Sequence, residues 1–372
     1  MLTNEACLLV SMQIKTYGID VNALTRAQYT GVERYVFELI RELMKKPLYK
    51  NERVFLYSSA IVKNIGELPD GWEWKILNLP LLKKGWTHLR LSFELFVNPP
   101  SVFFSPAHEI PLFHRKSKIV NTIHDIAFVH VPEVYTFFAQ ARQRWAIKRA
   151  IKLSNHILTV SYTTKNDLNN YYSVNQAMMT VARLGVSHRK NFLNSDHGSY
   201  FLTLGRIEKK KNIEFLIKVF ERFAQKHENI KLLLVGKMGD GSEQILKQID
   251  NSKIKKNIEI LGFVPDDQLQ SLFARSLAFL FPSKYEGFGM PVLEAMSENV
   301  PVIASDIPAL REICENSAIF ASPYSEDEWL GALESIMDDN VRADLITKGK
   351  EQIKKFSWEQ TARTTLKVLR NV

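Results

Sequence analysis

Short apolar segments recur along the chain, each followed by a polar or glycine-bearing loop and then by a stretch with helical periodicity. The first is Ile14–Ile19, and apolar residues at i, i+3, i+4 and i+7 between Val32 and Leu43 predict the helix after it. Strands that alternate with helices in this way are typical of a mostly parallel sheet with helices on both faces. Further strands are predicted at Val54–Tyr57, Val102–Phe104, Ile119–Ile123 and Ile157–Val160.

The second half repeats this alternation. A strand at Tyr200–Leu204 and a helix at Ile213–Lys226 open it, and the chain closes with a helix from Trp358 to Leu369. The remaining predicted strands are Lys231–Val235, Ile258–Leu261, Ala278–Phe281 and Val302–Ala304. A single hydrophobic core stops growing at roughly 250–300 residues, so a chain of 372 residues predicts two domains.

These boundaries predict an N-terminal domain at 12–190, a C-terminal domain at 199–357 and a last helical segment at 358–372. For this last segment, packing back on the N-terminal domain is one arrangement. The polar stretch from Val186 to Ser199 is interpreted as the linker between the domains. Residues 1–11 precede a second methionine and are interpreted as an extended start outside the fold.

Composition and net charge restrict the class of protein less than the alternation of strands and helices does. No apolar run reaches the ~18–20 residues that cross a bilayer, and the start of the chain lacks the order of a secretory signal, so we expect a cytoplasmic protein. The net charge of +9 is compatible with nucleic acid, anionic lipid or a phosphorylated substrate, and equally with no polyanionic partner.

The segment after the predicted strand Ala278–Phe281 is a glycine loop that leads into a helix, with Pro291 expected at the first helical position. Glycines let the backbone approach a ligand closely, and free N–H groups at a helix start attract an anion such as a diphosphate. Glu294, expected on the first helical turn, can accept hydrogen bonds from ribose hydroxyls, and Glu286 can accept them from a sugar. The alternative is an ordinary loop–helix connection in which Glu294 only favours the helix dipole.

A second segment, Gly205–Asn212, places four basic residues between a strand and a helix. Cations are unfavourable at a helix N-terminus unless an anion compensates them. Arg206 offers a planar fork for phosphate oxygens and Lys211 a compact charge, so the two can stabilise a departing nucleoside diphosphate. The alternative is a solvated basic loop, which is the preferred interpretation for Lys209 and Lys210.

Together the two segments resemble the donor-binding half of glycosyltransferase family 4, a group of retaining enzymes with the GT-B fold. The family signature is two glutamates separated by seven residues, and Glu286 and Glu294 match it with Gly-Phe-Gly and Pro-Val-Leu between them. Arg206 and Lys211 match the positions that hold the donor diphosphate. The resemblance implies an α/β protein with two doubly wound Rossmann-like domains facing across a cleft, where ligands bind beyond the strand ends.

The resemblance extends to the first half of the chain. The loop around Gly31 resembles the glycine loop that faces the donor phosphates, and His124 resembles a histidine beside the transferring sugar. From its chemistry alone, a histidine at a strand end is either structural or a hydrogen-bond donor to a sugar. The implied catalytic residues are His124, Arg206, Lys211 and Glu286, and the implied donor-binding residues are Gly31, Gly205, Gly236, Phe263, Val264, Gly287, Phe288, Gly289 and Glu294.

The implied reaction moves a hexose from a nucleoside-diphosphate sugar to a glycan or lipid-linked glycan in polysaccharide synthesis, with retention at the anomeric carbon. GDP-mannose is the preferred donor, and UDP-glucose or another UDP-hexose is the alternative. No metal and no cofactor are expected, because cationic side chains replace the metal and no Asp-x-Asp motif is present. A nucleotide- or nucleic-acid-binding regulatory protein is the alternative from another class, although no RNA-binding motif supports a nucleic-acid partner.

The motifs do not identify the acceptor. Leu81–Leu91 mixes apolar and basic residues as a membrane-surface segment does. A basic helical region follows further on, with Arg142, Arg144, Lys148, Arg149 and Lys152. The hypothesis is that these stretches dock a lipid-linked acceptor at the inner face of the membrane, and a solvated face over an ordinary core is the alternative.

Overall fold

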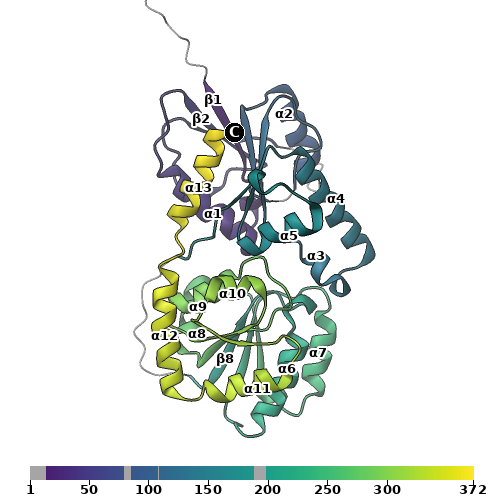
Figure 1. Cartoon of the computed structure of the whole chain (residues 1–372), viewed down its shortest axis with the longest axis vertical. Helices are drawn as coiled ribbons and strands as arrows, with labels where there is room; N and C mark the ends of the chain where they lie inside the picture. The colour runs from purple at the N-terminus through teal and green to yellow at the C-terminus, as the bar shows by residue number, and fades with distance from the viewer. Residues whose placement is uncertain (1–13, 79–84, 108, 188–197) are drawn as a thin grey trace, which may run out of the picture. The chain divides into compact units, whose positions relative to one another are not determined.

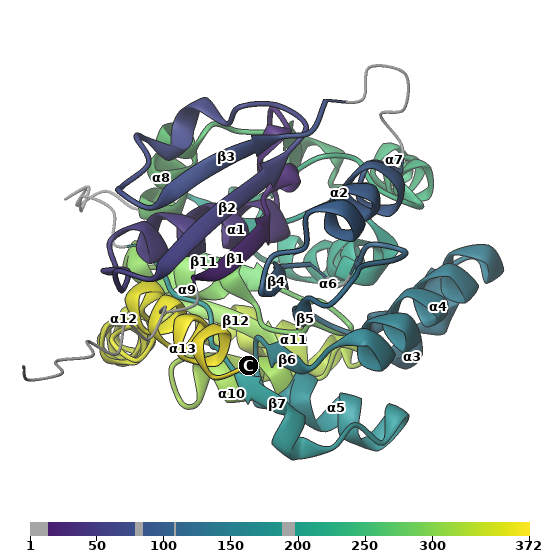
Figure 2. The same cartoon turned by 90° about the horizontal axis from the view of Figure 1, so that it is seen from above.

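The computed structural model describes residues 14–78, 85–107, 109–187 and 198–372. The strands of the first sheet are β1 (Lys15–Asp20), β2 (Glu52–Ser58), β3 (Trp72–Ile76), β4 (Val102–Ser105), β5 (Lys118–Ile123), β6 (His156–Thr159) and β7 (Met179–Val181). They lie in the order β3-β2-β1-β4-β5-β6-β7, which can be followed in Figure 2. The pairs from β3 to β5 are parallel.

The second sheet is parallel throughout its described pairs, in the order β10-β9-β8-β11-β12-β13. Its strands are β8 (Tyr200–Leu204), β9 (Lys231–Val235), β10 (Ile258–Gly262), β11 (Ala278–Phe281), β12 (Val302–Ser305) and β13 (Ile319–Ala321). Parallel strands need crossover connections, and helices supply them here. The α/β class predicted from the alternation is therefore confirmed.

Helices connect the strands, and among the described residues no helix is both long and apolar enough to span a bilayer. In the first half they are α1 (Gly31–Met44), α2 (Ser92–Val97), α3 (Ala127–His130), α4 (Phe137–Leu153) and α5 (Tyr162–Tyr172). In the second half they are α6 (Ile213–Ala224), α7 (Ser242–Asn251), α8 (Asp266–Arg275), α9 (Met290–Ser297), α10 (Pro308–Cys314), α11 (Glu326–Ser335), α12 (Asp339–Ile353) and α13 (Trp358–Asn371).

The core of the second sheet explains why its helices form where they do. On α6 the buried apolar residues recur at helical spacing and pack with the strand residue Phe201 and with Trp329 of α11 in one cluster. Figure 1 shows α6 and α7 on one side of the strands and α8, α9 and α12 on the other. The central strands β8, β9, β11 and β12 are buried on both faces. Polar side chains gather instead at the carboxyl ends of the strands.

Contacts divide the described chain into two compact units, and each unit combines segments that are separated in the sequence. The first contains the described residues up to Thr122, together with Ala146–Leu158 and Ala362–Val372. The second contains Ile123–Trp145 and the described residues of Thr159–Thr361. The domain boundaries 12–190, 199–357 and 358–372 stay a prediction. The predicted linker falls mostly on 188–197, which lie outside the described residues, as do residues 1–11.

Three strands, β3, β7 and β13, were not predicted from the apolar periodicity of the sequence. All three are edge strands of their sheets. An edge strand has a neighbour on one side only, so it can be short or half exposed. No residue of β3 is fully buried, and β7 and β13 have three residues each. Such strands carry little of the apolar signal on which the prediction rests.

The end of the C-terminal helix is tied to the start of β2 by a buried carboxylate. Arg370 of α13 donates from Nε and Nη2 to the two oxygens of Glu52, at 2.9 and 2.7 Å. The same carboxylate accepts from the Tyr17 hydroxyl at 2.8 Å and from the Tyr49 backbone N–H at 2.9 Å. Burial by itself raises the pKa of Glu52, but these donors, Arg370 first, lower it below its usual value.

We expect Arg370→Met to lower the free energy of unfolding by about 1–3 kcal/mol, because it leaves a buried carboxylate short of donors. The lowered pKa of Glu52 means that its contribution is complete above the unfolded-state value, roughly 4.3, and is lost as the pH falls through the folded-state value. The difference between wild type and variant should therefore shrink in acid. Urea unfolding at neutral and acid pH measures it, with the exposed Lys367→Met as control. An equal loss in both variants would contradict the expectation.

Candidate functional site

Three glycine loops meet at the carboxyl ends of β8, β9 and β10. The Gly205 N–H donates to Val235 O at 2.9 Å, and the Gly236 N–H donates to Gly262 O at 2.8 Å. A Cβ on Gly236 would lie 1.8 Å from Gly205 O, and its φ is +140°. Only glycine allows this approach of the two backbones. Strand pairing thus brings the predicted residues Gly205 and Gly236 together.

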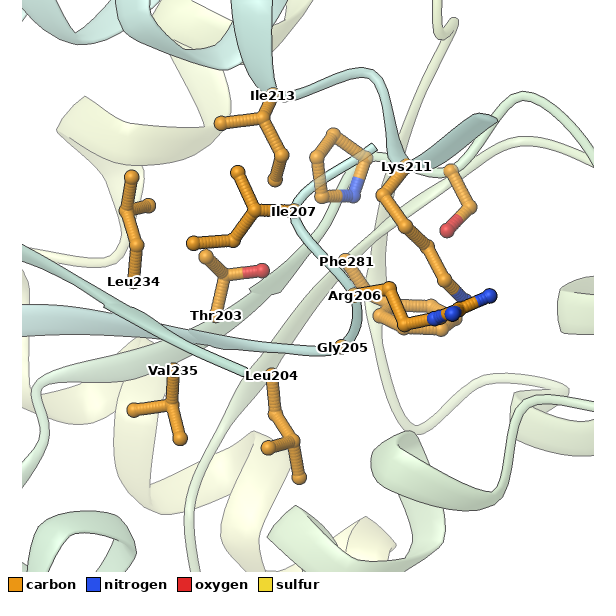
Figure 3. Close-up of a pocket in the computed structure, with 12 residues that line it drawn as sticks. Thr203, Leu204, Gly205, Arg206, Ile207, Lys211, Ile213, Leu234, Val235 and Phe281 are labelled. Carbon is orange, nitrogen blue, oxygen red and sulfur yellow. The ribbon is translucent and has the colours of Figure 1, made fainter. Parts of the chain in front are cut away.

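Two cations of the basic loop after Gly205 differ in their exposure to solvent. The Arg206 side chain is 63% exposed, whereas that of Lys211 is 16% exposed. Figure 3 shows both residues among those that line one small cavity at the end of β8. Lys211 Nζ lies 4.9 Å from the centre of the Phe281 ring. The cavity of about 10 Å³, large enough for no more than one water, is lined mostly by apolar residues of β8, β9 and α6.

Lys211 forms a buried ion pair with the first glutamate of the signature. Its Nζ lies 2.5 Å from Glu286 Oε1, and both side chains are largely buried. Burial raises the pKa of Glu286, but the charges of Lys211 and then Lys210 lower it more, so the pKa of this carboxyl lies below its usual value. Glu286 is therefore ionised at neutral pH. Two predicted catalytic residues, 75 positions apart in the chain, are in direct contact.

Lys210 corrects the interpretation of the basic loop. Its side chain is largely buried rather than solvated, and its Nζ lies 3.3 Å from Asp125 Oδ2. Burial lowers the pKa of Lys210, but the charges of Asp125 and Glu286 raise it well above its usual value. The prediction of a solvated Lys210 was wrong because a run of three lysines does not reveal which of them turns inward. Lys209 is exposed, as interpreted.

The His124 segment contacts the glycine loop of the signature. A Cβ on Gly287 would lie 2.0 Å from His124 O and 2.8 Å from Asp125 Cβ. The Ser161 hydroxyl donates to Gly287 O at 2.6 Å, and the Thr164 hydroxyl donates to His124 O at 3.1 Å. Gly287 is thus needed for a close approach of two backbones, and this approach places His124 beside the signature loop.

The helix after the signature loop begins one residue earlier than expected. Gly289 is its N-cap with φ +111°, α9 starts at Met290, and Pro291 is its second residue, not its first. Glu294 therefore lies on the second turn of α9, and its predicted position on the first turn was wrong. The Phe288 ring is buried edge-on against Phe356, with ring centres 5.9 Å apart, so its side chain packs in the core.

The remaining predicted residues lie in separate places. Phe263 and Val264 follow β10, where they help line an open hollow of about 400 Å³, and Lys237 Nζ lies 5.7 Å above the half-exposed Phe263 ring. Gly31 is the first residue of α1 in the first unit, where the Thr30 backbone N–H donates to the Glu33 carboxylate as part of a capping box. The donor-facing role of Gly31 stays a prediction.

One buried polar group near the site escaped the sequence analysis. The Tyr285 hydroxyl donates to Asp167 Oδ2 at 2.5 Å, and the Tyr285 ring stacks on His130 at 4.4 Å between ring centres. Burial and the Asp167 charge raise the pKa of Tyr285 far above its usual value, so it stays protonated. The partners are 118 residues apart, and no sequence spacing could have joined them.

The carboxylates and lysines of the site are coupled, and a double-mutant cycle can measure this. We expect Asp125→Asn and Lys210→Met each to destabilise the protein, and the double variant to lose less than the sum by about 1–3 kcal/mol. The control is the exposed pair Lys348–Asp344, 2.5 Å apart, whose coupling should be about 0–1 kcal/mol. Additive losses at Lys210 and Asp125 would show that the pair contributes nothing.

A family profile described as "Glycosyl transferases group 1" matches residues 187–352, which contain most of this site. The chain is 30% identical over 253 residues to an uncharacterized glycosyltransferase, MJ1178 of Methanocaldococcus jannaschii, covering 66% of this chain and 68% of the relative. The chain therefore belongs to the group 1 glycosyltransferases and is a glycosyl-transferring enzyme.

Two further relatives have more specific names. O-antigen chain mannosyltransferase RfbU of Salmonella typhimurium is 30% identical over 62% of this chain, which spans 63% of that relative. O-antigen chain mannosyltransferase B of Escherichia coli is 26% identical over 91% of this chain and 95% of its own length. These names describe what the chain is similar to.

Solved structures agree on the fold. Sucrose-phosphate synthase from Thermosynechococcus elongatus superimposes with a TM-score of 0.74 at 17% identity, over 96% of this chain and 98% of that one. Anabaena Alr3699/HepE in complex with UDP-glucose gives a TM-score of 0.75 at 16% identity, over 96% and 100%. With its two parallel sheets, the chain has the GT-B fold of two Rossmann-like domains that the resemblance implied.

Proposed function

We propose that the chain is a retaining hexosyltransferase that moves mannose from GDP-mannose to a glycan or lipid-linked glycan in polysaccharide synthesis. The observation that carries the proposal is that Arg206 and Lys211 line one cavity at the strand end, with the ionised Glu286 against Lys211. The names of the two O-antigen mannosyltransferases support the sugar. The UDP-glucose complex of a fold neighbour keeps a UDP-hexose donor as the second candidate.

In the proposed reaction the donor diphosphate lies at Arg206 and Lys211, and the hexose lies toward Glu286 and His124. The bond from the anomeric carbon to the phosphate oxygen breaks, and the acceptor oxygen bonds to the anomeric carbon on the same face. The departing phosphate oxygen takes the acceptor proton. The two cations stabilise the charge that develops on the leaving group, which is why the proposal requires neither metal nor cofactor.

Glu286 has a positioning role in this scheme. Its lowered pKa keeps it an acceptor of hydrogen bonds at neutral pH, so it can hold sugar hydroxyls. Its pairing with Lys211 fixes both side chains before the donor arrives, which spares reorganisation in the transition state. Glu294 is proposed to hold the ribose from the second turn of α9.

The proposed acceptor places the enzyme at the inner face of the membrane as a peripheral protein. Of the stretch that suggested this, Leu81–Lys84 lies outside the described residues. In the described remainder, Trp86 and Leu91 are buried and Leu89 is exposed. Most of the apolar residues of that described remainder therefore belong to the core.

We expect Arg206→Ala and Lys211→Ala each to lower kcat/KM by about 10²–10³, because each removes a charge that stabilises the leaving diphosphate. Release of nucleoside diphosphate from the sugar nucleotide gives the rate, and circular dichroism checks the fold. Lys209→Ala is the matched control, since Lys209 is an exposed cation of the same loop that the proposal does not place at the diphosphate. A folded Arg206→Ala/Lys211→Ala double variant with wild-type turnover would refute the assignment.

A thermal-shift panel of nucleoside diphosphates and sugar nucleotides tests the donor, because a ligand of the folded state raises its stability. GDP and GDP-mannose should raise the melting temperature more than UDP and UDP-glucose. The reverse order would replace mannose by a UDP-hexose. Glu294→Ala should weaken binding of the preferred nucleotide by roughly tenfold, the cost of a lost hydrogen bond to a charged group, while the exposed Glu351→Ala should leave it unchanged.

A further inference from the structure

The short helix α2 carries an apolar face that the described protein leaves exposed. Phe93, Phe96 and Val97 are 59%, 49% and 53% exposed. Their spacing of three and four residues places them on one side of the helix. The buried Leu95 of the same helix anchors it to the first unit, so the exposed face is not the result of a poorly attached helix.

The segment 111–116 extends this face. The Phe113 ring meets the Phe96 ring edge-on at 6.2 Å, and both are exposed. The Leu112 N–H donates to the Ser92 hydroxyl at 2.7 Å, which fixes the segment along α2. Together these exposed residues form the α2 apolar face, which consists of Phe93, Phe96, Val97, Leu112 and Phe113.

Helix α4 adjoins this segment on its other side. Arg149 donates from Nη2 to Pro111 O at 2.7 Å and also to Leu112 O. The guanidinium therefore joins α4 to the strip that carries part of the α2 apolar face. Large contiguous apolar patches on a soluble protein mark sites where another molecule binds.

The charges around the α2 apolar face are mostly positive. Helix α4 contains five basic residues and no acidic one. Exposed cations follow in the strip itself, at Arg115 and Lys116, then at Lys118 and, on α4 near Arg149, at Lys148 and Lys152. On α2 the acid is Glu94, which Arg90 pairs at 3.3 Å, and Glu109 precedes the strip. An apolar centre with a basic surround is complementary to an anionic bilayer, whose headgroups attract the cations while the interface takes up aromatic rings.

We propose that the α2 apolar face, with the cations of 115–118 and α4, docks on the surface of an anionic lipid bilayer. The inference rests on the proposed function in that a lipid-linked acceptor gives the docking its purpose. The basic region of α4 was already part of the hypothesis from the sequence, whereas the α2 apolar face was not. The five apolar residues insert at the headgroup level, and the cations bind phosphates around them.

Vesicle flotation of the full chain tests the docking. The probes are vesicles of phosphatidylcholine with about a third phosphatidylglycerol, and vesicles of phosphatidylcholine alone. The wild type should float with the anionic vesicles at low salt and much less with the neutral ones. Phe93→Ser/Phe96→Ser should lower the bound fraction at least tenfold, and Lys148→Gln/Lys152→Gln should weaken the salt dependence. Tyr324→Ser, an exposed aromatic in the other unit, is the control and should bind as the wild type does.

Several outcomes would overturn the docking. One is absence of wild-type binding to anionic vesicles at low salt, and another is equal binding by the wild type and Phe93→Ser/Phe96→Ser. Sedimentation velocity that shows a wild-type dimer lost in this variant would assign the face to a second copy instead. The nucleotide thermal-shift panel contains no lipid, so its failure would refute the proposed donor, while a failed flotation with an intact panel would refute only the docking.

Discussion

The buried pair of Lys211 and Glu286 is the interaction on which the rest of the site depends. It joins the loop after β8 to the loop after β11. These two strands are neighbours in one parallel sheet. A carboxylate and an ammonium are each costly to bury alone, so neither loop can adopt its conformation without the other. Lys210 and Asp125 form a second such pair, and Lys210 also lowers the pKa of Glu286. The four side chains form one neutral cluster whose members must be present together.

This cluster also explains the glycines around it. Asp125 contacts Lys210 with its side chain, while the backbone of the His124–Asp125 segment lies against the signature loop and leaves no room for a Cβ on Gly287. Ser161 and Thr164, at the start of α5, donate to the carbonyls on both sides of the contact. The glycine is therefore a packing requirement of the resting protein, whatever else its backbone does for a ligand.

The sequence alone was sufficient for the central strands, the two-sheet architecture and the position of Arg206, Lys211 and Glu286 in loops that follow strands. These features rest on long apolar runs and on motifs at strand ends, which are local signals. The edge strand β3 was missed because none of its residues is fully buried. Lys210 was misjudged because its partner Asp125 is 85 positions away. The start of α9 differed by one residue because Gly289 is the N-cap, so that Met290 and not Pro291 is the first helical residue. A proline is tolerated at the second position because its missing N–H would have no partner within the helix.

The two cations of the proposed diphosphate site have different tasks because of how they are held. Lys211 is buried and already paired, so its position is fixed and its charge is largely balanced by Glu286. Arg206 is exposed, and the carboxylate of Glu208 lies 3.9 Å away, a distance at which the interaction is weak and screened. An arriving diphosphate thus gains most new charge stabilisation from Arg206 and most geometric order from Lys211. Loss of charge stabilisation and loss of placement are therefore separable effects in this arrangement. The first is the effect of removing Arg206.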